Sequence, residues 1–217
     1  MEEQIHEELN FLLANYPQLS GCMEDVLDAF ELMKNTCRNG GLILTCGNGG
    51  SAADAEHIVG ELMKGFKLRR PVTGEQREAL VTAFPDDGAY FADNLQRGIP
   101  AISLVSQSSI ISAFSNDVTY DMAFAQQVFC YGAAGDVLLG ISTSGNSINV
   151  VNACKVANAF GIATIAMTGE SGGSLLGICD ITIRVPATET FRVQEYHLPI
   201  YHTLCAMLEN DLFGGDI

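Results

Sequence analysis

The sequence predicts an α/β fold in which helices flank both faces of a five-stranded parallel sheet, preceded by N-terminal helices. Five short runs are mainly apolar, at residues 42–46, 101–105, 137–141, 163–167 and 181–185. Segments with helical spacing separate them, and this alternation is typical of a parallel sheet buried on both faces. The 217 residues, 47% of them apolar, can bury a substantial core. We therefore expect residues 1–217 to form a single domain.

The first two predicted helices precede the sheet. Apolar residues recur at helical spacing over residues 5–14 and 20–36, and the dipeptide Tyr16-Pro17 separates the two segments. This N-terminal helical extension, residues 1–38, can pack on the domain or on another subunit. The pattern leaves both arrangements open.

The remaining elements alternate along the chain. An alanine-rich helix over residues 52–63 follows the first strand, and the polar, basic residues 64–76 predict a surface loop or excursion. Asn116 and Asp117 predict a turn, and residues 168–173 a glycine-rich turn. Further helices are expected at residues 77–82, 90–96, 110–114, 121–131, 148–160 and 190–212.

Charge and composition exclude several classes of function. The net charge of −15 at pH 7 argues against nucleic-acid binding, which needs clustered Lys and Arg. No apolar run approaches the roughly 20 residues that span a bilayer, and the acidic first residues lack the layout of a signal peptide. We expect a cytoplasmic protein that does not insert into a membrane. The seven cysteines form no C-x-x-C pair, which is typical of reduced core thiols.

Small polar residues crowd the turn that follows the third strand. This turn lies between the strand at residues 137–141 and a helix beginning near residue 148, and it contains four hydroxyls: Ser142, Thr143, Ser144 and Ser147. A strand-to-helix turn exposes backbone N–H groups at the positive end of the helix dipole, where they bind anions. The turn therefore predicts a cradle for a phosphate-sized anion.

A second glycine-rich turn follows the first strand. Gly47-Asn48-Gly49-Gly50-Ser51 lies at the same carboxyl edge of the predicted sheet, where ligands of α/β folds bind. With Ala52 it satisfies the dinucleotide pattern G-x-G-x-x-A, but the acidic residue expected about 20 positions later is missing. We expect no nucleotide cofactor. The third-strand turn lacks the last glycine of the G-x-S-x-G elbow, which argues against a serine hydrolase.

Two helices carry paired candidates for acid–base or metal chemistry. His57 and Glu61 share a helix face at i, i+4 spacing, and Gln194 and His202 lie on the last predicted helix. Such a pair can ligate a metal or divide acid–base work, and it is also common on solvated helix faces. His6 stands alone near the N-terminus.

Three stretches, residues 47–62, 140–147 and 192–202, resemble the SIS (sugar isomerase) domain family, and within it the phosphoheptose isomerases. The likeness extends over nearly the whole chain. It implies a three-layer, flavodoxin-like fold, a homotetramer with active sites between subunits, and the N-terminal extension used in oligomerisation. The implied activity is an aldose–ketose isomerisation through an enediol, with sedoheptulose 7-phosphate as the expected substrate.

The resemblance also implies site residues. Glu61 and His202 match the acid–base pair, and His57, Glu61, Gln194 and His202 match the ligands of one zinc ion. The phosphate-binding positions are Ser142, Thr143, Ser144 and Ser147. The other substrate-binding positions are Asn48, Gly49, Gly50, Ser51, Glu61, Asn116, Asp117 and Gln194.

The chain departs from the family pattern at residues 64–98, a segment that looks longer than in typical heptose isomerases and carries its own basic run. This leaves the identity of the sugar open, including another ketose phosphate. A second alternative is a non-catalytic sugar-phosphate sensor or a regulator that binds a protein such as DnaA. Such relatives generally lose the acid–base residues, whereas this chain keeps both Glu61 and His202.

Overall fold

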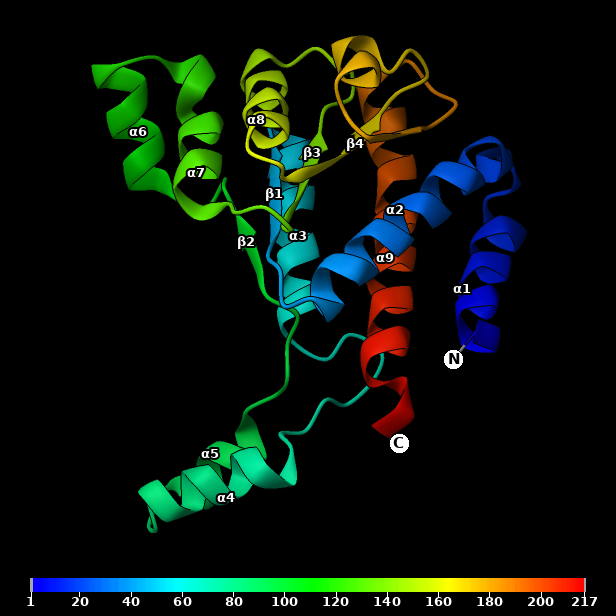
Figure 1. The fold of residues 1–217 in the computed structure, drawn as a ribbon. Helices are drawn as coiled ribbons and strands as arrows, with labels where there is room; N and C mark the ends of the chain where they lie inside the picture. Colours follow the sequence, from blue (N-terminus) through cyan, green and yellow to red (C-terminus); the bar gives the residue numbers. More distant parts are fainter. Residues whose placement is uncertain (1, 217) are drawn as a thin grey trace.

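A computed structural model describes the backbone of residues 2–216 and the side chains of residues 6–215. Its sheet has five parallel strands in the order β2-β1-β3-β4-β5 (Figure 1). The strands are β1 Ile43–Gly47, β2 Ala101–Ser103, β3 Val137–Ile141, β4 Ala163–Thr168 and β5 Ile181–Arg184. Every residue of β1 and β3 is buried. The predicted fold class is confirmed.

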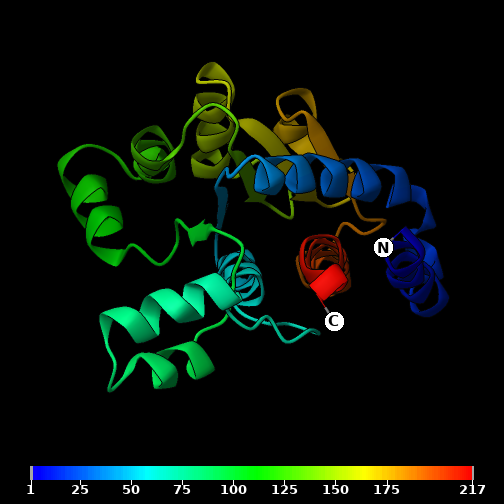
Figure 2. The ribbon, with the colours of Figure 1, turned by 60° about the horizontal axis from the view of Figure 1, so that its bottom comes forward.

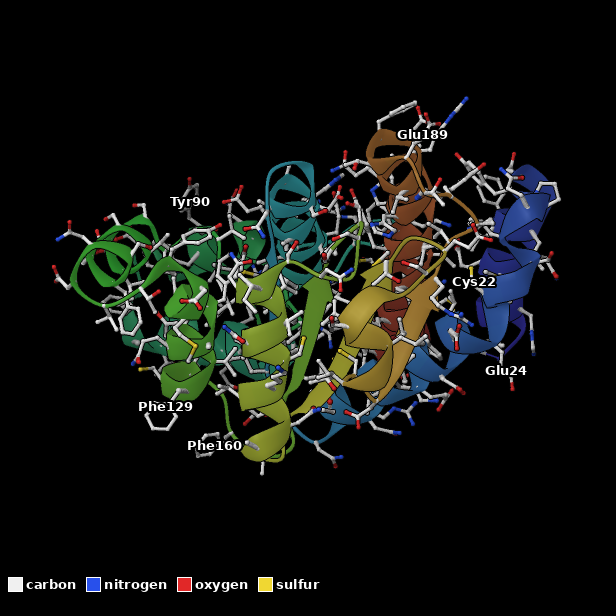
Figure 3. The ribbon with its side chains drawn as sticks, turned by 90° about the horizontal axis from the view of Figure 1, so that it is seen from above. Cys22, Glu24, Tyr90, Phe129, Phe160 and Glu189 are labelled. Carbon is white, nitrogen blue, oxygen red and sulfur yellow. The ribbon has the colours of Figure 1, made fainter. Side chains whose placement is uncertain are left out.

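Helices cover both faces of the sheet. On one face, α2 (Met23–Arg38), α3 (Gly50–Met63) and α9 (Thr190–Phe213) pack with Ile43, Leu139 and Ile165 in one hydrophobic cluster. On the other face, α7 (Ala123–Tyr131) and α8 (Ile148–Ala159) pack with Leu44 and Leu138. Successive strand residues therefore face opposite helix layers, which is why the strands are mainly apolar instead of alternating with polar residues. On the outside of the second layer, Phe129 of α7 and Phe160 of α8 lie edge to face at 5.2 Å between ring centroids (Figure 3).

The N-terminal helices pack on the domain. Both α1 (Glu2–Asn15) and α2 contact α9, which lies between α1 and α3 (Figure 2). The short helix η1 (Pro17–Cys22) joins α1 to α2 at the predicted Tyr16-Pro17 break. Leu12, Phe30 and Met33 are buried, whereas Phe11 stays 68% exposed. The N-terminal helices therefore pack on the domain of their own chain, which is the first of the two arrangements that the pattern allowed.

Residues 64–98 contain the predicted loop at residues 64–76 and the two helices predicted at residues 77–82 and 90–96. They form a neck from which α4 (Gly74–Ala83) and α5 (Gly88–Asn94) project as a helical arm (Figures 1 and 2). A capping box of Thr73 and Gln76 begins α4, which buries none of its residues. Arg70 of the neck is fully buried, because its guanidinium pairs with the buried Glu209 of α9. The prediction of an exposed basic stretch is wrong at this residue.

The turn predicted at Asn116 and Asp117 is also wrong. Both residues belong to the last turn of α6 (Ser108–Asp117), and the N–H groups of Val118 and Thr119 bond to the Phe114 carbonyl to end the helix. The remaining short helices are η2 (Tyr120–Met122), η3 (Gly173–Gly177) and η4 (Gly214–Asp216). Within the described residues, no helix is long and apolar enough to cross a membrane.

Candidate active site

The loop between β3 and α8 gathers its hydroxyls at the start of a helix. Ser147 precedes α8, and the Ser142 hydroxyl donates to the Ser147 hydroxyl at 2.9 Å. The Ser144 hydroxyl accepts from the Asn146 N–H at 3.2 Å and is exposed, while Thr143 is half-buried. These neutral donors surround the positive end of the α8 dipole, which is the arrangement that holds a phosphate.

A neighbouring helix supports this loop. Gly145 has φ +66°, and a Cβ there would lie 2.0 Å from the Gly172 carbonyl oxygen, so only glycine fits. The Asn146 side chain accepts from both the N–H and the hydroxyl of Ser174, at 2.9 and 2.8 Å. The loop is therefore held by η3 from the other side.

The loop that follows β1 lies beside the β3 loop, because β1 and β3 are paired strands. The Asn48 amide donates to the Asn149 side chain at 2.8 Å and accepts from Asn149 and from the Tyr120 hydroxyl at 2.9 and 3.0 Å. Ser51 is buried in the first turn of α3. Asn149 and Tyr120 thus fix Asn48, and with it the first predicted ligand loop, at the carboxyl edge of the sheet.

Gln194 reaches the β1 loop from α9. A Cβ on Gly50 would lie 2.5 Å from Gln194 Nε2, so the absence of a side chain at Gly50 lets the glutamine approach the backbone. Gln194 and Gly50 are therefore neighbours, as their shared substrate-binding prediction requires.

His57, Glu61 and His202 meet further along α3 and α9. His57 Nε2 lies 3.2 Å from Glu61 Oε1, and its Nδ1 lies 2.9 Å from the Tyr201 hydroxyl. The rings of His57 and His202 are 5.0 Å apart in an edge-to-face arrangement. The Tyr201 hydroxyl donates to Asp54 at 3.3 Å. The two predicted acid–base residues thus flank one histidine.

The surroundings favour the ionised form of Glu61 and the neutral form of His202. Burial raises the pKa of Glu61, but a hydrogen bond from Lys64 Nζ at 2.8 Å and the charges of Lys64 and His57 outweigh it, and the net pKa is lowered. Burial, and next the charge of His57, lower the pKa of His202, against a smaller opposing effect of Glu61. At neutral pH a carboxylate and a neutral imidazole therefore stand close together.

The zinc prediction was tested against the donor set. Imidazole and carboxylate groups suit zinc, and His202 Nε2 is buried without a hydrogen-bond partner among the described residues. Gln194, however, lies eight residues before His202 on α9, about 12 Å along the helix axis. Within residues 6–215 no three His, Cys, Asp or Glu side chains are arranged to hold a metal ion. The described residues thus show no preformed zinc site, and zinc is not shown by the structure.

Asn116 and Asp117 lie apart from these groups. Both are exposed at the end of α6, and the Asn116 amide donates to Asp117 at 2.8 Å. Their link to the site is indirect, because α6 packs on η2, which carries Tyr120. The structure does not bring them to Glu61 or His202.

Several neighbours of the site were not predicted from the sequence: Asp54, Lys64, Phe66, Tyr120, Asn149 and Tyr201. Lys64 could have been found, since it lies three residues after Glu61 on the helical register. The others contact residues more than 70 positions away or lie in segments without a motif.

Comparison with known proteins places the chain in a family. A family model for the SIS domain matches residues 19–83 and 88–169. The chain belongs to the SIS domain family. The interruption between the two matched segments, residues 84–87, falls at the tip of the α4–α5 arm of this SIS domain.

Within the SIS family, the chain is similar to phosphoheptose isomerases. The one from Aliarcobacter butzleri is 40% identical over 191 residues, which cover 88% of this chain and 87% of the relative. The solved phosphoheptose isomerase from Neisseria gonorrhoeae has a TM-score of 0.72 and 32% identity, covering 96% of this chain and 98% of its own. That from Francisella tularensis has a TM-score of 0.74 and 29% identity, with 96% and 97% covered.

Proposed function

We propose that this SIS domain is a phosphoheptose isomerase, which interconverts sedoheptulose 7-phosphate and D-glycero-D-manno-heptose 7-phosphate. The relatives of similar length support the activity, and the anion cradle at Ser142–Ser147 supports a phosphorylated substrate. One observation carries the proposal. An ionised carboxylate at Glu61 and a neutral imidazole at His202 lie on either side of His57, where both can accept a proton.

The reaction moves one proton between two carbons and one between their oxygens. A base takes a proton from C1 of the ketose while the C2 oxygen gains one, which forms an enediol. The proton then returns to C2, and the C1 oxygen loses its proton to give the aldose. Glu61 or His202 carries the proton between the carbons as a base, and the other serves the oxygens. The group that serves the oxygens gives a proton to the C2 oxygen and takes one from the C1 oxygen, which an imidazole does through its ring N–H and a carboxyl group does from its protonated form. Both assignments are consistent with the geometry.

The other predicted site residues bind rather than react. Ser142, Thr143, Ser144 and Ser147 are proposed to donate to the phosphate, and Asn48, Gly49, Gly50, Ser51 and Gln194 to contact the sugar. Asn116 and Asp117 are proposed contacts from the edge of the site. A neutral cradle avoids binding nucleic-acid backbones, in keeping with the net charge of −15.

Zinc stays a prediction. When bound, a metal of this kind polarises a substrate carbonyl as a Lewis acid. The steps above use only the side chains, since no three His, Cys, Asp or Glu side chains among residues 6–215 are arranged to hold a metal ion. Isothermal titration calorimetry measures the zinc affinity of the protein. The same titration on a Gln194→Ala variant measures how much Gln194 contributes to that affinity.

We also propose that the site is completed in a homo-oligomer, with a tetramer as the expected form, and that residues 1–38 of this single 1–217 domain contribute to subunit contacts. Gly50 and Glu61 are eleven residues apart on α3, about 16 Å along its axis. The six carbon–carbon bonds of a heptose span at most about 9 Å. The predicted site residues of one chain thus extend over a greater distance than the length of the sugar. A cytoplasmic location is part of the same proposal.

Mixing two inactive variants tests the shared site. Glu61→Gln lacks one acid–base group, and Ser144→Asp places a negative charge in the phosphate loop. If partner chains combine their groups, subunit exchange between the two variants restores part of the turnover. If one chain holds the whole site, the mixture stays inactive. Light scattering on the same samples gives the oligomeric state.

Glu61→Gln and His202→Ala test the chemistry directly. Each is expected to lower kcat roughly 10²- to 10⁴-fold, the usual contribution of a general acid or base. Matched controls are Glu56→Gln, an exposed carboxylate on the same helix, and His6→Ala on α1, which should stay within twofold of the unchanged protein. Near-native turnover of either site variant removes that residue from the mechanism.

A panel of C5 to C7 sugar phosphates, assayed with and without zinc, defines the substrate. Conversion of the C7 ketose phosphate alone supports the proposal. Conversion of another ketose phosphate would keep the isomerase activity and change only the identity of its substrate. If no sugar phosphate is converted but one raises the melting temperature, the protein is a sensor instead.

A further inference from the structure

Arg70 and Glu209 form an ion pair in which both side chains have no exposed surface. Arg70 Nε donates to Glu209 Oε1 at 2.7 Å. A buried pair is a poor source of net stability, because removing two charges from water costs about as much as their attraction returns. Net stability therefore does not explain the pair. The other hydrogen bonds of Arg70 and Glu209 show which segments the pair connects.

Glu209 holds the neck of the arm. Its carboxylate accepts from three consecutive backbone N–H groups, those of Phe66, Lys67 and Leu68, at 2.8, 2.7 and 3.0 Å. Hydrogen bonds from several N–H groups to one carboxylate are charge-assisted and directional. Residues 66–68 are thereby fixed to α9.

Arg70 holds the end of α3. Its guanidinium donates to the Leu62 carbonyl at 2.7 Å and to the Glu61 carbonyl at 3.4 Å. These carbonyls lie in the last turn of α3, where a helix has no partners of its own. Phe213 of α9 covers the guanidinium at 4.7 Å from its ring centroid. The pair thus joins α3, the neck and α9 at one point.

The segment held in this way touches both members of the acid–base pair. The Phe66 ring packs on the His202 ring at 5.5 Å between centroids. Lys64 Nζ donates to Glu61 Oε2 at 2.8 Å. The side chain of Glu61 and the backbone carbonyl of the same residue are therefore both bound by residues of the neck.

We propose that Arg70 and Glu209 are positioning residues for Glu61 and His202: their buried pair fixes the neck between α3 and α9 and so sets the separation of the two groups. The proposal rests on the function assigned above to Glu61 and His202. It predicts that disturbing the pair lowers turnover more than substrate binding, since the phosphate cradle belongs to β3 and α8.

Arg70→Lys and Glu209→Gln test the pair. Lysine keeps the charge but lacks the planar fork that reaches Glu209 and two carbonyls together. We expect kcat to fall roughly 10- to 100-fold, as for small misplacements of catalytic groups, with KM within threefold. Asp136→Asn is the matched control, because Asp136 is a buried carboxylate that accepts from the N–H groups of Leu42 and Ala133 away from the site. It should lower the melting temperature and leave kcat unchanged.

Imidazole resonances provide a readout that needs no turnover. The chain has four histidines, so the ring signals of His202 can be assigned by substitution. Arg70→Lys, Glu209→Gln and Phe66→Leu should all shift the His202 signals, and Asp136→Asn should not. Phe66→Leu leaves the ion pair intact. If Glu209→Gln does not fold, the His202 signals of Phe66→Leu still test whether the neck affects that ring.

The outcomes separate the two proposals. If folded Arg70→Lys keeps the unchanged kcat and His202 signals, or if Asp136→Asn loses as much kcat, the positioning role is overturned. If the unchanged protein converts no sugar phosphate, the proposed function fails, and the His202 signals still decide whether the pair positions that ring.

Discussion

Ser144 is the exposed hydroxyl of the proposed phosphate cradle, and its oxygen accepts from the Asn146 N–H. Ser144→Ala removes one donor to the phosphate without touching Glu61 or His202. We expect KM to rise about three- to tenfold, which corresponds to the roughly 1 kcal/mol of one hydrogen bond, with kcat within twofold. Steady-state kinetics on the heptose phosphate measure both parameters.

Ser112→Ala serves as the control for this substitution. Ser112 is also an exposed serine whose hydroxyl bonds locally, to the Ser109 carbonyl at 3.1 Å, but it lies on α6. It should change neither parameter. A Ser144→Ala variant with the unchanged KM and a lowered kcat would contradict the assignment of this loop to the phosphate.

At the residue scale, sequence reasoning found groups that lie within one motif. Ser142 and Ser147 are five positions apart in one turn, and His57 and Glu61 lie on one helix face, so local geometry determines their contacts. The partners of Asn48 could not be found in this way. Asn149 is 101 positions away and is brought to Asn48 by the pairing of β1 with β3. Tyr120 is 72 positions away and is placed by the packing of η2 on α8.

At the element scale, the hydrophobic pattern predicted those elements whose position depends only on burying apolar residues. The strand at residues 137–141 matches β3 in both bounds, because its residues are apolar and buried on both faces. The polar neck was predicted as a surface loop because composition does not show that the Arg70 charge has a buried partner in α9. Asn116 and Asp117 are common in turns, yet here they end a helix.

The α4–α5 arm is expected to be dispensable for folding. No residue of α4 is buried, and Pro71 pairs with Gln96 across the neck, so a Gly-Ser linker can replace residues 73–94. Tyr90 stands exposed on this arm (Figure 3). We expect the melting temperature to stay within about 4 °C, the shift that ~1 kcal/mol causes in a domain of this size. Circular dichroism measures it, and a loss of cooperative unfolding would show that the arm belongs to the core.

The same shortened protein addresses the role of the arm. Val81, Phe84 and Tyr90, which the shortened protein lacks, leave large apolar surfaces exposed. Light scattering shows whether the oligomer survives without them, and the sugar-phosphate panel shows whether the arm limits the choice of sugar.

For the whole molecule, acid stability should depend on His197. This residue of α9 is fully buried, its Nε2 donates to the Thr168 carbonyl at 3.3 Å, and burial lowers its pKa to about 4. In the unfolded chain a histidine has a pKa of about 6.5. The unfolded state therefore binds more protons between these values, and the contribution of His197 to stability is present above pH ~6.5 and is lost as the pH falls to about 4. The difference amounts to about 3 kcal/mol.

His197→Gln tests this contribution, since glutamine can still donate to the Thr168 carbonyl but does not titrate. The free energy of unfolding, measured in urea at a fixed protein concentration, should fall less steeply in the variant than in the unchanged protein between pH 6.5 and 4. Carboxylates titrate in both proteins, so the difference in slope isolates the histidine. His6→Gln, on the exposed surface of α1, should keep the full slope. Equal slopes in His197→Gln and the unchanged protein would mean that the interior takes up the charged imidazole at little cost, against the rule for a buried ring with one hydrogen bond.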